Sequence, residues 1–63
     1  MPDERIAEIC SDLASLVERL DELALEALRD AVDQGATARP ELERRLVRAR
    51  NALERARHVL EAG

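Results

Sequence analysis

The sequence lacks aromatic residues entirely: none of its 63 residues is Phe, Tyr or Trp. No side chain can therefore supply the large buried area that an aromatic ring gives to a small core. A single Cys excludes an internal disulfide, and no cluster of His, Cys, Asp and Glu has the spacing of a metal site. A domain this small without either kind of cross-link is usually stabilised by oligomerisation.

Other absences narrow the functional class. No apolar run approaches membrane-spanning length, and the acidic start at Asp3 and Glu4 is the reverse of a secretory leader. A lone Cys suits a reducing compartment, so the sequence predicts a cytoplasmic protein. There is no Gly-rich phosphate loop, only one His, and no supported nucleophile–base pair. We therefore expect no enzyme activity, no cofactor and no bound metal.

What the sequence does have is two apolar stripes in alternating steps of three and four residues. The first contains Ile6, Ile9, Leu13, Leu16, Leu20, Leu23 and Ala27, and the second contains Leu42, Leu46, Ala49, Leu53, Ala56 and Leu60. This spacing is typical of amphipathic helices that pack on other helices. The sequence thus predicts an all-α fold.

The break between the stripes predicts one domain, 1–63, folded as an antiparallel two-helix hairpin. Gly35 suits the position after a helix C-terminus, and Pro40 suits the first position of a helix. Helix 1 should span about 3–33, the loop 34–39 and helix 2 about 40–61. A turn centred on Thr37 would pair residues whose numbers sum to about 74.

The apolar surface of helix 1 is wider than one partner helix can cover, because Leu25, Leu28 and Val32 lie outside its stripe. Helix 2 alternates Leu with Ala, which favours close packing on helix 1. We expect two hairpins to form a homodimeric four-helix bundle. The predicted core and oligomer interface contains Ile9, Leu13, Leu16, Leu20, Leu23, Leu28, Leu46, Leu53 and Leu60.

Charge is divided between the two halves: residues 1–34 carry ten acids and three Arg, and residues 35–63 carry four acids and seven Arg. One interpretation is that the arginines pair with the acidic helix. The expected pairs are Asp30 with Arg44, Glu26 with Arg48, and Glu18 with Arg55 or Arg57. The other is phosphate binding by Arg44, Arg48 and Arg55, which the net charge of −4 and the lack of stacking aromatics oppose.

Two residues have potential chemistry. Cys10 is interpreted as a small buried residue near the helix 1 stripe, able to form an intermolecular disulfide if it lies near a dimer axis. His58 shares a helix face with Glu54 and Glu61, which we interpret as a solvated face because the spacing matches no metal signature.

These patterns favour a non-enzymatic module for protein–protein interaction and oligomerisation. The chain is similar in length and hairpin plan to the Rop family of RNA-binding plasmid regulators, although none of that family's RNA-facing residues is matched. This resemblance implies an alternative role in RNA or DNA binding. A regulatory, antitoxin-like subunit of a hetero-complex is a further alternative. Chorismate mutase-type dimers also begin with a long helix that carries an Arg, and Arg5 or Arg19 could take that role here. This chain is one helix short of that fold.

Overall fold

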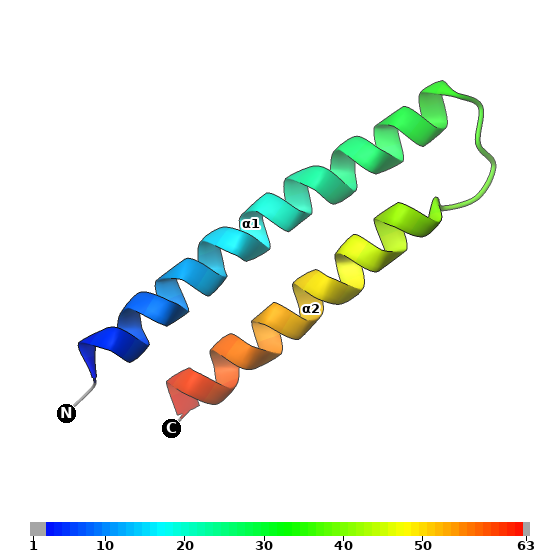
Figure 1. Ribbon diagram of the computed structural model, residues 1–63. Helices are drawn as coiled ribbons and strands as arrows, with labels where there is room; N and C mark the ends of the chain where they lie inside the picture. The colour runs from blue at the N-terminus through cyan, green and yellow to red at the C-terminus, as the bar shows by residue number, and fades with distance from the viewer. Residues whose placement is uncertain (1–2, 63) are drawn as a thin grey trace.

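The computed structural model describes residues 3–62 as two long antiparallel helices joined by a loop (Figure 1). Helix α1 spans Glu4–Asp33 and helix α2 spans Glu41–Ala62. The hairpin is a rod whose longest extent is 52 Å and whose shortest is 10 Å. The prediction of an all-helical hairpin is confirmed.

Asp3 caps the start of α1. Its Oδ1 accepts a hydrogen bond from the backbone N–H of Arg5 at 2.8 Å, and its carboxylate also accepts bonds from the Arg5 guanidinium. A cap of this kind satisfies one of the four backbone donors that a helix leaves unpaired at its N-terminus. The bonds from Arg5 lower the pKa of Asp3.

Gly35 ends α1. Its φ of +84° lies in the left-handed region that favours glycine. The backbone N–H of Gly35 donates to the carbonyl of Val32, and that of Ala36 donates to the carbonyl of Ala31, both at 2.9 Å. This is the Schellman pattern, and it turns the chain out of the helix within one residue.

The early turn changes the expected register. Asp21 and Arg50 form the ion pair that joins the two helices, with Oδ1 and Nε 3.1 Å apart. Their numbers sum to 71, so the expectation of 74 from a turn at Thr37 is wrong. Because the chain reverses at Gly35, the rest of the loop runs back beside the last turn of α1. Figure 1 shows α1 extending beyond the start of α2 at this end.

The face that α1 turns toward α2 is rotated from the predicted stripe. It consists mainly of two rows of buried and half-buried residues: Cys10, Val17, Ala24 and Ala31, and Leu13, Leu20 and Ala27. Half-buried Ala14 lies beside the first row. Val17 and Ala24 are the most enclosed, at 5% and 8% exposed. The first row replaces Ile9, Leu16 and Leu23, which are exposed.

Helix α2 is rotated in the same sense. Its half-buried and buried rows are Leu46, Leu53 and Leu60, and Glu43, Arg50 and Arg57, with half-buried Val47 and Glu54 beside the second row. Leu42, Ala49 and Ala56 are exposed. The expected close packing of α2 on α1 through its alanines is therefore wrong. The long methylene stems of Arg50 and Arg57 can cover the small side chains of α1. Their guanidinium groups bind carboxylates, Arg50 that of Asp21 and Arg57 those of Glu54 and Glu61.

Candidate interaction surface

Both helices leave an apolar row exposed beside the seam. In α1 this row contains Ile9, Leu16 and Leu23, and in α2 it contains Leu42, Ala49 and Ala56. We call these six residues the leucine–alanine face. Leu23 is 49% exposed, although Leu20 and Ala24, which face α2, are half-buried and buried.

The two rows lie on the same side of the hairpin. In α1 each residue of the exposed row lies four positions before a seam residue, such as Leu13 or Leu20. The same offset holds in α2, where the seam residues are Leu46 and Leu53. Antiparallel helices reverse both chain direction and apparent sense of rotation, so equivalent rows flank the seam on one side. Together they form one surface with leucines on α1 and mostly alanines on α2.

Ion pairs occupy the opposite side of the seam. Asp21 binds Arg50 there, and Arg57 is held by two carboxylates of its own helix. The Arg57 guanidinium donates to Glu54 at 2.7 Å and to Glu61 at 2.8 Å. These bonds lower the pKa of Glu54 and raise the pKa of Arg57. This side also carries Leu28, at 36% exposed, whereas three large apolar residues of α1, Ile9, Leu16 and Leu23, are exposed on the leucine–alanine side.

The predicted core residues fall into two groups. Half-buried between the helices lie Leu13, Leu20, Leu46, Leu53 and Leu60. Exposed in the hairpin are Ile9, Leu16 and Leu23, on the leucine–alanine face, and Leu28, on the other side of α1. Whether the second group enters an oligomer interface stays a prediction.

The predicted ion pairs between the helices are wrong in every case. Arg44 and Arg48 bind Glu41 of their own helix, at 2.9 and 3.5 Å, instead of Asp30 and Glu26. Among the described residues, Asp21 alone of the nine acids of α1 pairs with α2, and Arg55 forms no ion pair. Most of the negative charge of α1 is therefore not compensated within the hairpin.

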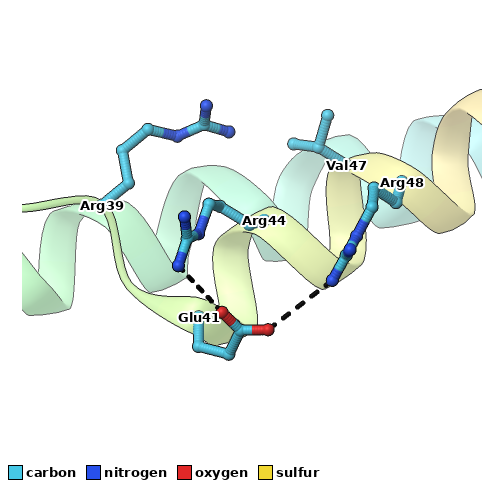
Figure 2. Close-up of a pocket in the computed structure, with 5 residues that line it drawn as sticks. All are labelled: Arg39, Glu41, Arg44, Val47 and Arg48. Carbon is cyan, nitrogen blue, oxygen red and sulfur yellow. Dashed lines mark hydrogen bonds and ion pairs between the residues drawn. The ribbon is translucent and has the colours of Figure 1, made fainter.

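An open depression of about 400 Å³ lies where α2 begins, lined by Arg39, Glu41, Arg44, Val47 and Arg48 (Figure 2). Three arginines around one hollow suggest a phosphate site, but each of them is already bound to a carboxylate. Glu41 lies between Arg44 and Arg48 and binds both, as Figure 2 shows. Nucleic-acid contact by Arg44, Arg48 and Arg55 stays a prediction, and the pairs with Glu41 weaken it for Arg44 and Arg48.

Arg39 completes this cluster by pairing with a buried carboxylate. Its Nε and terminal nitrogen donate to the two oxygens of Glu43 at 2.7 and 3.0 Å, which raises the pKa of Arg39. Glu43 is only 7% exposed. Hydropathy could not reveal that Glu43 faces α1. Its spacing of seven residues from Arg50, which also lines the seam, indicates that the two side chains share a helix face.

Cys10 and His58 acquire little chemistry from the fold. Cys10 is half-buried in the row that faces α2. His58 lies 3.7 Å from Glu54, whose carboxylate is already bonded to Arg57. Within residues 3–62 no group of three His, Cys, Asp or Glu side chains is placed to hold a metal ion.

The Arg57–Glu54 bond predicts a pH-dependent contribution to stability. A carboxylate whose pKa is lowered by folding stabilises the fold above its unfolded pKa, about 4.3 for Glu, and loses that effect as pH falls through the folded pKa. Glu54→Gln should lower the melting temperature at pH 7 and leave it nearly unchanged at pH 3. Thermal melts followed by circular dichroism measure both.

The matched control is Glu18→Gln, because Glu18 forms no ion pair among the described residues. It should not lower the melting temperature at pH 7. An equal loss in the two variants would show that the Arg57–Glu54 bond does not stabilise the fold.

Comparison of this chain with family models, curated proteins and solved structures gives no match. Between residues 3 and 62, neither helix is long and apolar enough to cross a membrane. The candidate function therefore depends on the leucine–alanine face and on the distribution of charge around it.

Proposed function

We propose that this chain is a non-enzymatic helical module whose hairpin self-associates into a four-helix bundle. The observation that supports the proposal is the leucine–alanine face, an apolar row on each helix that the hairpin leaves uncovered on one side. A second copy would convert both rows into core.

The small interior of the hairpin supports the same conclusion. In the part of the chain the structure describes, Val17 and Ala24 are the only buried apolar residues, and they keep 5% and 8% of their surface exposed. Domains below about 70–80 residues rarely obtain more than 3–5 kcal/mol from one core and commonly rely on disulfides, metals or oligomerisation. Self-association would bury apolar area at about 25 cal/mol per Å².

The test is the solution mass across a range of protein concentrations. Because the chain has no Trp or Tyr, light scattering should be combined with refractive-index detection. We expect about 14 kDa, twice the 7.1 kDa of the chain, with high helicity. The melting temperature should rise with protein concentration, as it does for any fold that is coupled to assembly.

A stable, fully helical 7.1 kDa monomer would contradict the proposal. A weakly helical monomer would also contradict self-association, and would instead favour the hetero-complex alternative, in which a different protein covers the leucine–alanine face. Binding to hairpin RNA at low salt by a folded monomer would favour the nucleic-acid alternative.

A further inference from the structure

Two hairpins joined through the leucine–alanine face can be arranged in two symmetric ways. If the twofold axis runs along the helices, each α1 lies over α2 of the other copy. If the axis runs across the helices, each α1 lies over α1 of the other copy. Side-chain size and charge distinguish these arrangements, and the choice rests on the proposed self-association.

Side-chain size favours α1 over α2. The Asp21–Arg50 pair places Leu23 at nearly the level of Ala49, which precedes Arg50, and places Leu16 near Ala56. A twofold axis along the helices preserves these levels. Each leucine of one copy then lies over an alanine of the other, where a small residue leaves room for a large one.

The overall charge of the helices favours the same arrangement. Helix α1 carries nine acids and three Arg, whereas α2 carries four acids and six Arg. Stacking α1 on α1 would bring together two helices of the same net charge. Stacking α1 on α2 would bring together opposite signs, at an edge where the acids of α1 lack partners in their own hairpin.

One pair makes the argument specific. Glu26 follows Leu23 by three residues on the outer edge of the leucine–alanine face, and Arg45 occupies the equivalent edge of α2, three residues after Leu42. Given the Asp21–Arg50 register, Arg45 lies at the level of Glu26. Neither residue forms an ion pair among the described residues of the hairpin.

We propose that a second copy of this chain docks on the leucine–alanine face with its α1 over α2, about an axis parallel to the helices. In this arrangement Leu23 and Leu16 of each copy pack on Ala49 and Ala56 of the other. Glu26 of each copy forms an ion pair with Arg45 of the other, at both edges of the bundle.

Charge reversal tests this pairing without changing the core. Homodimers of Glu26→Arg would place two arginines together at each edge, and homodimers of Arg45→Glu would place two glutamates together. A heterodimer of the two variants would restore an opposite pair at both edges. After the variants are mixed, refolded together and kept reduced, ion-exchange chromatography or native mass spectrometry measures the three dimers.

Random pairing gives a heterodimer twice as abundant as either homodimer. We expect roughly a ten-fold excess, since each exposed pair changes from repulsive to attractive, and the excess should shrink at high salt. The control is Glu18→Arg mixed with Arg45→Glu. Glu18 lies on the side of α1 away from the face, so this mixture should show the two-fold ratio.

The outcomes separate the arrangement from the proposed function. Dimers of about 14 kDa with random pairing at low salt would overturn the α1-over-α2 arrangement and leave self-association intact. Variants and unmodified chain that are all monomeric, at 7.1 kDa, would overturn both.

Discussion

Leu23→Glu is expected to convert the dimer into monomers at micromolar concentration. In the hairpin Leu23 is 49% exposed, so the change costs little within one copy. In the proposed bundle it is buried against Ala49 of the other copy, and each buried Leu contributes about 1.5–3 kcal/mol. Because the dimer is symmetric, this contact is lost twice, and an unpaired carboxylate would enter the interface at each place. Light scattering should show the mass fall from about 14 kDa to 7.1 kDa.

Leu25→Glu is a closely matched control for this experiment. Leu25 is 47% exposed and lies only two residues away, but it projects from a different side of α1. Its substitution should leave the dimer mass unchanged. If Leu25→Glu dissociates the dimer and Leu23→Glu does not, the interface is not the leucine–alanine face.

Leu20→Ala is expected to be the most destabilising single truncation in α1. Leu20 is half-buried in the seam and adjoins the leucine–alanine face, so it would contact both α2 and the other copy. Core truncations of this kind cost about 2–5 kcal/mol, which is comparable with the whole stability expected of so small a domain. Urea unfolding followed by circular dichroism should show loss of most helicity, or a much lower midpoint.

Leu25→Ala again provides the comparison, since truncating an exposed residue usually changes stability by less than about 0.5 kcal/mol. Equal midpoints for Leu20→Ala and the unmodified chain would mean that Leu20 is not part of the core.

The sequence predicted the hairpin because its signals agree across levels. Two heptad stripes, Gly35 after the first and Pro40 before the second all indicate two helices joined by a short loop. The ends follow from local chemistry: Asp3 caps α1 through the Arg5 N–H, and Gly35 adopts the positive φ that ends it.

The face by which the helices meet could not be predicted in the same way. In α1, apolar residues occupy both the row of Leu16 and Leu23 and the row of Val17 and Ala24, so hydropathy favours neither. In α2, Arg50 and Arg57 lie outside the predicted apolar stripe. Their aliphatic stems allow them to line the seam, which a polar–apolar classification does not register.

The ion pairs were the least predictable feature. A shift in register from 74 to 71 moves every cross-helix neighbour by nearly one turn, so Arg50 meets Asp21 while Arg44 and Arg48 turn to Glu41. Surface pairs are individually weak, at about 0–1 kcal/mol, and therefore follow the register and do not set it.

By itself, the sequence determined that this chain forms two amphipathic helices in a hairpin, since helix periodicity and end signals are local properties. Only the tertiary structure decided the rotation of each helix about its own axis, and hence which apolar row is covered. Rotation and register depend on how the two surfaces fit together, and on the site at which Gly35 reverses the chain. That choice left Leu16 and Leu23 exposed beside Ala49 and Ala56, the surface on which the proposed assembly depends.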